Sequence, residues 1–189
     1  TLRELPVLVP PAIEAAIRDA KSVSEPLCGA GESEVLRTPT VNIGTVSAGL
    51  KINLVPDCAT AEVDIRLPVG LGTDAALAEV RRALDPLPGL EVEVLRRFEP
   101  TATDPGHEIF TLLGANAEAV MGRRPVLNMR VGASDARLYR AAGVPTAVYG
   151  PTPYNMGGPD EYVTLDDLTT IARVYALTAF DFLAPRGAA

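Results

Sequence analysis

Residues 125–168 constrain the fold of this chain most, because they carry the pattern of a strand, a helix, a second strand and a last helix. Residues 125–130 and 145–149 are apolar runs typical of strands, and the helix between them ends at Gly143. Two strands joined by one helix form a parallel pair with a right-handed crossover, and ligands bind at the carboxyl ends of such strands. The loops at residues 132–135 and 150–160 are therefore the first candidates for a site.

The preceding part of the chain has a different pattern. A helix is predicted to begin at Pro11, followed by a loop over residues 26–31. Apolar and polar residues then alternate in residues 40–44 and 60–67, as in half-buried strands, and a hairpin-like connection joins these two runs. A helix over residues 74–85 and a strand over residues 91–98 follow. This order predicts a ferredoxin-like βαββαβ sandwich whose first strand is weak or missing.

Residues 100–105 are rich in proline and threonine and mark a boundary between two domains. We predict an α/β chain with one domain at residues 1–101 and a second at residues 102–189. The second domain also contains a helix that stops at Gly122 and a last helix near the carboxyl end. The tail from Pro185 to Ala189 is predicted to be disordered.

Charge and cysteine content exclude several classes of partner. The formal net charge of -7 argues against a nucleic-acid or anionic-membrane partner, and no apolar run is long enough to span a bilayer. Cys28 and Cys58 are too few for a disulfide framework, so a reducing, cytoplasmic location is expected. Because the chain begins at Thr1 and contains one histidine, His107, we expect it to be a piece of a longer polypeptide.

Two motifs resemble catalytic signatures and are better explained by turns. Residues 70–75, GLGTDA, match a dinucleotide fingerprint, but the neighbouring strands alternate as half-exposed strands do, so Thr73 or Asp74 is predicted to cap a helix. Ser134 follows a strand and precedes a helix like a nucleophile elbow. In hydrolases with a nucleophile elbow the catalytic histidine follows the serine in the chain, whereas here His107 precedes Ser134. His107 is instead predicted at a helix start.

Carboxylates gather near the two candidate loops, where they could hold a hard cation. The favoured interpretation is that Ser134 or Asp135, and Asp166 or Asp167, cap helices. No combination of His, Cys and carboxylate residues has the spacing of zinc ligands. The carboxylates concerned are Asp135, Asp160, Glu161, Asp166 and Asp167.

Arg66 lies on the polar face of a predicted strand, and two roles are open to it. A guanidinium group on an open strand face can form a bidentate pair with the carboxylate of a substrate. Alternatively, Arg66 forms an ion pair with Glu62 or Asp64 on the same face. Asn53 and Arg137 are the other polar residues for which no structural role is evident.

Five motifs resemble those of the M20 metallopeptidase family, in the same order and spacing. They are TVNIGTVSAG at residues 40–49, NLVPD at 53–57, AEVDIR at 61–66, GASDAR at 132–137 and PDEYV at 159–163. This family includes acetylornithine deacetylase, succinyl-diaminopimelate desuccinylase and other amidohydrolases. The resemblance implies that residues 1–101 are most of a lid, or dimerisation, domain and that residues 102–189 are the carboxyl-terminal portion of the catalytic domain.

The resemblance also implies a small-molecule substrate with a carboxylate, zinc as cofactor and a homodimer formed through the lid. Nearly all metal ligands and the catalytic Glu belong to the amino-terminal half of the catalytic domain, which this chain lacks. The family's histidine ligand in the last loop is replaced by Gly157. No catalytic or metal residue is therefore assigned. The residues expected to bind substrate are Asn53, Arg66, Gly132, Ser134, Asp135 and Arg137.

From this resemblance we expect a portion of a zinc-dependent M20-type hydrolase that acts on N-acyl amino acids or small peptides. This portion is expected to be inactive alone. The alternative is a degenerate family member that serves as a non-catalytic dimerisation or ligand-binding module.

Overall fold

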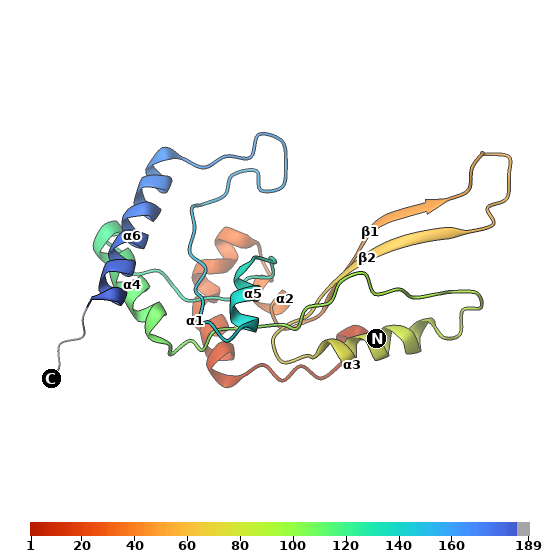
Figure 1. The fold of residues 1–189 in the computed structure, drawn as a ribbon, viewed down its shortest axis with the longest axis horizontal. Coiled ribbons are helices and arrows are strands. Elements are labelled where there is room, and N and C mark those ends of the chain that lie inside the picture. Colours follow the sequence, from red (N-terminus) through yellow and green to blue (C-terminus); the bar gives the residue numbers. More distant parts are fainter. Residues whose placement is uncertain (185–189) are drawn as a thin grey trace.

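A computed structural model describes residues 1–184, and the predicted disordered tail lies outside the described residues. The helices α1, α2 and α5 lie in the middle, with α4 and α6 at one end and the two strands and α3 at the other (Figure 1). This mixture confirms the α/β class. The elements are η1 (Leu2–Glu4), α1 (Pro11–Cys28), α2 (Glu32–Val35), β1 (Thr40–Ala48), β2 (Ala59–Arg66), α3 (Thr73–Leu84), α4 (Glu108–Met121), α5 (Ala136–Ala141) and α6 (Leu165–Leu183).

The strands β1 and β2 form the antiparallel hairpin predicted from their alternating pattern. The register pairs Thr40 with Arg66 at the base and Ala48 with Ala59 near the tip. A bulge between Ile43 and Thr45 leaves one extra residue on β1, which bends the strand. Arg66 is thereby fixed at the end of the hairpin nearest the helices (Figure 1).

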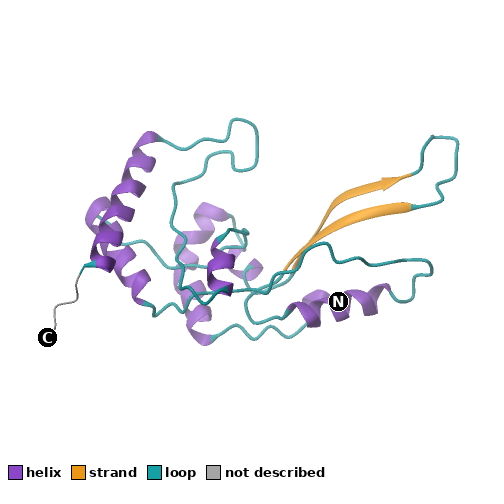
Figure 2. Cartoon of the chain, viewed as in Figure 1, coloured by secondary structure: helices purple, strands orange, loops and turns teal. Residues whose placement is uncertain are grey.

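Three predicted strands are not formed. Residues 91–98, 125–130 and 145–149 have no ladder with another strand in the described part of the chain, and Figure 2 draws them as loop. Strand propensity expresses packing against neighbouring strands, so an apolar run without a neighbour stays extended and unpaired. The βαββαβ prediction is therefore confirmed only for α1, β1, β2 and α3 in order.

A threonine side chain takes the place of a strand partner for residues 145–149. The Thr103 hydroxyl donates to the Thr146 carbonyl oxygen at 2.9 Å and accepts from the Thr146 amide at 2.8 Å. Both backbone polar groups of Thr146 are thereby satisfied without a ladder. The Tyr149 carbonyl accepts a hydrogen bond from the Tyr175 hydroxyl of α6, which anchors the other end of the segment.

The groups that cap α3 and α6 are not the ones predicted. The amide of Thr73 at the start of α3 donates to the Glu99 carboxylate at 3.0 Å, so neither Thr73 nor Asp74 caps the helix as predicted. The cap of α6 is Thr164, whose hydroxyl accepts from the Asp167 amide at 3.0 Å. The predicted caps Asp166 and Asp167 were wrong, although both lie in the first turn, where the helix dipole favours them.

The amino-terminal helices also depart from the prediction. α1 continues through Pro26 to Cys28, where a loop was predicted, and the short α2 was missed. Residues 2–4, where a weak first strand of the βαββαβ order would lie, form η1. The predicted helices near residues 74–85, 108–122 and 165–183 are confirmed, and Gly122 ends α4 in the left-handed conformation at φ 73°.

In the described residues, buried apolar side chains form two separate clusters. In the first, Ile13 and Ile17 of α1 pack with Leu36, and partly buried Ala102, Met129 and Val131 cover them. The second joins α4 to α6 through Leu113, Ala117 and Val174. Since the first cluster contains residues on both sides of the predicted boundary at residue 101, α1 and the extended segment before α5 are held together by apolar packing. The domain boundary itself stays a prediction.

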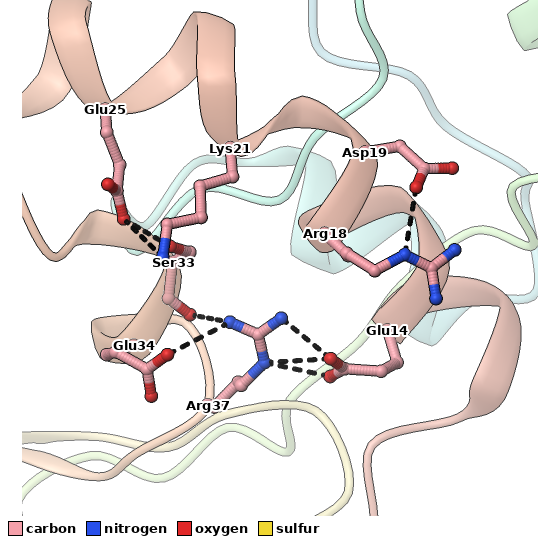
Figure 3. Close-up of polar contacts among 8 residues, drawn as sticks. All are labelled: Glu14, Arg18, Asp19, Lys21, Glu25, Ser33, Glu34 and Arg37. Carbon is pink, nitrogen blue, oxygen red and sulfur yellow. Dashed lines mark hydrogen bonds and ion pairs between the residues drawn. The ribbon is translucent and has the colours of Figure 1, made fainter.

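An ion-pair network fastens α2 to α1 (Figure 3). The Arg37 guanidinium donates to both oxygens of Glu14, from Nε to Oε2 at 2.9 Å and from Nη2 to Oε1 at 2.7 Å. The Ser33 hydroxyl of α2 also donates to the Glu25 carboxylate of α1. The Arg37 contact lowers the pKa of Glu14 below its ordinary value, because the hydrogen bonds stabilise the carboxylate.

The chain exposes much more surface than a compact protein of its size. Its accessible area is 13,572 Å², whereas a compact monomer of this mass has about 8,700 Å². The hairpin tip contributes aliphatic side chains such as Leu50, Ile52 and Val55, which are 88%, 107% and 89% exposed. Among the described residues, no helix has both the length and the apolar character needed to cross a bilayer.

Candidate functional site

The base of the hairpin meets the GASDAR loop, and Arg66 makes the contact. Its Nη1 donates to the Val131 carbonyl oxygen at 3.2 Å, and its Nε donates to the Asp64 carboxylate at 2.8 Å. The ion pair with Asp64 is one of the two roles predicted for Arg66, and Glu62 takes no part in it. The Arg66 side chain stays 47% exposed, so its remaining N–H groups are open to a ligand. We use the name junction site for Arg66, Val131, residues 132–137 and Phe98, whose ring lies against Arg137.

Arg137, the last residue of the motif, turns toward an aromatic ring. Its guanidinium carbon lies 4.6 Å from the centre of the Phe98 ring, and its Nη1 donates to the Ser134 carbonyl oxygen at 2.9 Å. The Nε atom is buried and has no hydrogen-bond partner in the described structure. The Arg137 guanidinium therefore interacts with other groups of the chain, and its Nε donor has no partner among them.

The other motif residues stand at the start of α5. Asp135 occupies the N-cap position without a side-chain cap, so the predicted capping by Ser134 or Asp135 was wrong. The Asp135 carboxylate is 85% exposed and lies 3.8 Å from Arg137 Nη1. A Cβ on Gly132 would meet no atom within 4 Å, so the loop is open at this residue. The loop thus presents backbone and one carboxylate around the Arg137 side chain.

Arg140, one turn beyond Arg137 on α5, was missed by the sequence analysis. Its Nε donates to the Thr101 hydroxyl at 3.1 Å, and no carboxylate pairs with it among residues 1–184. Burial lowers the pKa of Arg140, because the charged form loses solvation. The signal that could have revealed it is the spacing of two arginines three residues apart on one helix face.

Asn53 is not brought to the junction site. It lies in the exposed connection between β1 and β2, at the tip of the hairpin far from α5 (Figure 1). Of the residues expected to bind substrate, the structure gathers Arg66 with residues 132–137 and leaves Asn53 apart. Asn53 therefore takes part in substrate binding only if the other residues of its site come from a second chain.

Residues 150–164, which we call the tyrosine loop, contain the position where a metal ligand was expected. Gly157 has φ 74°, and a Cβ placed on it would meet nothing within 4 Å. The loop closes on itself, since the Gly157 amide donates to the Glu161 carboxylate at 3.3 Å and Tyr154 pairs with Tyr162. No hydrogen bond, ion pair or ring contact joins this loop to the junction site in the described residues.

The donor set does not fit a metal ion. Within residues 1–184, no three side chains of the types His, Cys, Asp and Glu come together as a metal-binding group. His107 caps α4, as the predicted helix start implied, and its Nδ1 accepts from the Ile109 amide at 3.2 Å. A histidine whose Nδ1 serves a helix cap, with no neighbouring ligand, does not form a zinc site.

Comparison with known proteins identifies the family. A family model described as peptidase family M20/M25/M40 matches residues 10–181. The chain belongs to this family. Two curated M20 relatives are succinyl-diaminopimelate desuccinylases, from Gluconacetobacter diazotrophicus at 34% identity over 147 residues and from Methylobacterium sp. (strain 4-46) at 33% identity over 146 residues.

The M20 chain is similar to only part of these relatives. The matches cover 77% and 74% of this chain but 36% and 35% of the two desuccinylases. Among solved structures, an M20 family metallo-carboxypeptidase from Sulfolobus solfataricus superimposes with a TM-score of 0.67 at 20% identity. That alignment covers 96% of this chain and 47% of the other, and it supports the fold alone.

Proposed function

We propose that this chain forms part of an M20 amidohydrolase that hydrolyses N-acyl amino acids or small peptides. The observation that carries the proposal is the position of Arg66, which bonds to Val131 beside the GASDAR loop and keeps N–H groups free. A planar guanidinium group suits a carboxylate next to the scissile amide. The relatives named as desuccinylases support this class of substrate.

Zinc is the metal that we propose for the whole protein, following the family resemblance. The residues described here contribute no cluster for it, so we derive no reaction step through the metal. The role proposed for this chain is to position the substrate. Gly157 stands where the family carries a histidine, and the tyrosine loop is held by its own hydrogen bonds instead.

A homodimer formed through the hairpin is the partner that we propose. The outer edges of β1 and β2 have no strand beside them among the described residues, and the tip exposes Leu50, Ile52 and Val55. Unpaired edges with apolar neighbours favour pairing with a second strand. We also propose a reducing, cytoplasmic location, which the two free cysteines, Cys28 and Cys58, support.

The test is hydrolysis of N-acyl amino acids by the metal-loaded whole protein, with residues 1–189 assayed alone beside it. We expect turnover by the whole protein and none by the chain alone. A whole protein that binds N-acyl amino acids but never hydrolyses them would indicate the alternative, a non-catalytic binding module. Turnover by residues 1–189 alone, lost on chelation, would refute the proposed positioning role.

A further inference from the structure

Two tyrosines of the tyrosine loop form a stacked pair that the proposed function does not use. The rings of Tyr154 and Tyr162 have centroids 4.7 Å apart and planes inclined by 8°. Their backbones form an isolated antiparallel bridge, with a 3.2 Å hydrogen bond in each direction. The Gly158 amide closes the turn by donating to the Asn155 carbonyl at 2.8 Å. The ring pair is thus held in place before a ligand arrives.

Both tyrosines of this pair are partly exposed. Tyr154 is 38% exposed and Tyr162 is 53% exposed, although each ring covers one face of the other. The face of a tyrosine ring carries a partial negative charge and attracts cations placed over it. The chain already contains one such contact, between Arg137 and Phe98.

The sequence around the pair carries charge of one sign. Between Arg140 and Arg173 the sequence contains no Lys, Arg or His, whereas it contains four carboxylates. None of these carboxylates forms an ion pair in the described structure, and Glu161 accepts only the Gly157 amide. An anionic group would be repelled here, and a cation would be attracted. The four are Asp160, Glu161, Asp166 and Asp167.

We propose that Tyr154 and Tyr162 form a stacking site for a planar cation, such as the guanidinium group of an arginine side chain. The ring face supplies the stacking surface, and the carboxylates close in sequence, such as Asp160, supply the opposite charge. This inference deepens the proposed function and rests on it: the site selects N-acyl or peptide substrates that carry a basic, planar end group.

The experiment compares two substrates in the metal-loaded whole protein. N-acetyl-L-arginine and N-acetyl-L-norleucine share the carboxylate and the amide, and only the first carries a planar cation. We expect a kcat/KM ratio that favours arginine, and Tyr162→Leu lowers this ratio about fivefold, the value of an exposed cation–π contact. Tyr139→Leu, which removes another exposed tyrosine on α5, leaves the ratio unchanged.

Two further variants keep the test decisive if Tyr162→Leu disturbs the loop. Tyr162→Phe preserves the stack and the ratio. Asp160→Asn removes one charge, keeps a residue that tolerates φ 56° and lowers the preference for arginine. An unchanged ratio in both Tyr162→Leu and Asp160→Asn overturns the stacking site and leaves the proposed hydrolase function intact.

Binding without metal separates the two proposals. Calorimetric titration of the metal-free whole protein with N-acetyl-L-arginine amide and N-acetyl-L-norleucine amide measures stacking without hydrolysis. Tighter binding of the arginine amide, lost in Tyr162→Leu, supports the site even if no substrate is hydrolysed. Equal binding of the two amides overturns the site whatever the enzyme assay shows.

Discussion

The guanidinium carbon of Arg137 lies 4.6 Å from the centre of the Phe98 ring, and one turn further along α5 the Nε of Arg140 bonds to the Thr101 hydroxyl. The two contacts are three residues apart on both segments. α5 therefore contacts Phe98 and Thr101, where the chain leaves the predicted lid domain. Arg137, which the family resemblance implied as a substrate contact, has an aromatic partner within the chain.

Replacing Arg137 should weaken this contact. Arg137→Met keeps an aliphatic side chain at this position and removes the cation over Phe98, so the free energy of unfolding should fall by about 0.5–1 kcal/mol. Urea unfolding measures the change. The double variant with Phe98→Leu should lose less than the sum of the two single losses, because each partner's loss removes the same contact. Strict additivity would mean that the ring and the cation do not interact.

Replacing Arg66 should impair substrate capture. In the metal-loaded whole protein, Arg66→Ala should lower kcat/KM for N-acyl amino acids about tenfold, through the lost charged hydrogen bonds to the carboxylate. Arg66→Lys should recover part of the loss. Asp64→Asn frees Nε from its ion pair and should not raise KM. If Arg66→Ala leaves both kinetic constants unchanged, the ion pair with Asp64 is the whole role of Arg66.

The Glu14–Arg37 pair should stabilise the chain in a pH-dependent way. The folded pKa of Glu14 lies below its ordinary value of 4.5, so the pair's contribution is complete above pH 4.5 and is lost as the pH falls toward the folded pKa. Glu14→Gln should cost about 0.5–1 kcal/mol at pH 7, since the pair is bidentate but partly exposed. Urea unfolding at pH 7 and pH 3 should show this cost shrinking at pH 3.

Chelation should leave residues 1–189 unaffected. Because the described residues contain no metal-binding group, the thermal midpoint of this chain should be the same with and without a chelator. Gly157→His supplies an imidazole in open space but no second ligand, so it should not retain zinc after dialysis. Stoichiometric zinc in either protein, measured by mass spectrometry of the metal, would contradict this reading of the site.

The packing of α4 on α6 should depend on Val174. This side chain is 0% exposed between the helices, and Val174→Ala removes two methyl groups' worth of contact, at a cost of about 2 kcal/mol. Leu177→Ala, on the same helix and 42% exposed before substitution, should cost less than half as much. Equal losses in thermal unfolding would show that α6 is not held by this cluster.

Local patterns in the sequence predicted the elements that depend on local interactions. The alternation in β1 and β2 and the apolar spacing in α3, α4 and α6 were sufficient, because each of these elements has its partner nearby in the chain or forms its own hydrogen bonds. The segments at residues 91–98, 125–130 and 145–149 have equally strong strand patterns. Their failure to pair depends on neighbours, which composition cannot reveal.

The site was predicted in the same partial way. The motif resemblance named Arg66 and residues 132–137 as parts of one site, and the structure places Arg66 against Val131 beside this loop. The resemblance could not show that Arg137 faces Phe98 or that Glu99 caps α3 from a distance. Those contacts join residues at least 26 positions apart. The stacked pair of Tyr154 and Tyr162 gave no sequence signal, because it follows from a turn with Asn155 and Asp160 at positive φ.

The reciprocal bonds between Thr103 and Thr146 also protect the chain against aggregation. An extended segment with free amides and carbonyls is a template on which a foreign strand can add, and the apolar residues 145–149 would be a strong template. A hydroxyl that engages both backbone groups of Thr146 interrupts this template at its second residue. The Thr103 side chain thereby acts as a gatekeeper against the addition of a foreign strand. Its loss should lower solubility during folding before it lowers activity.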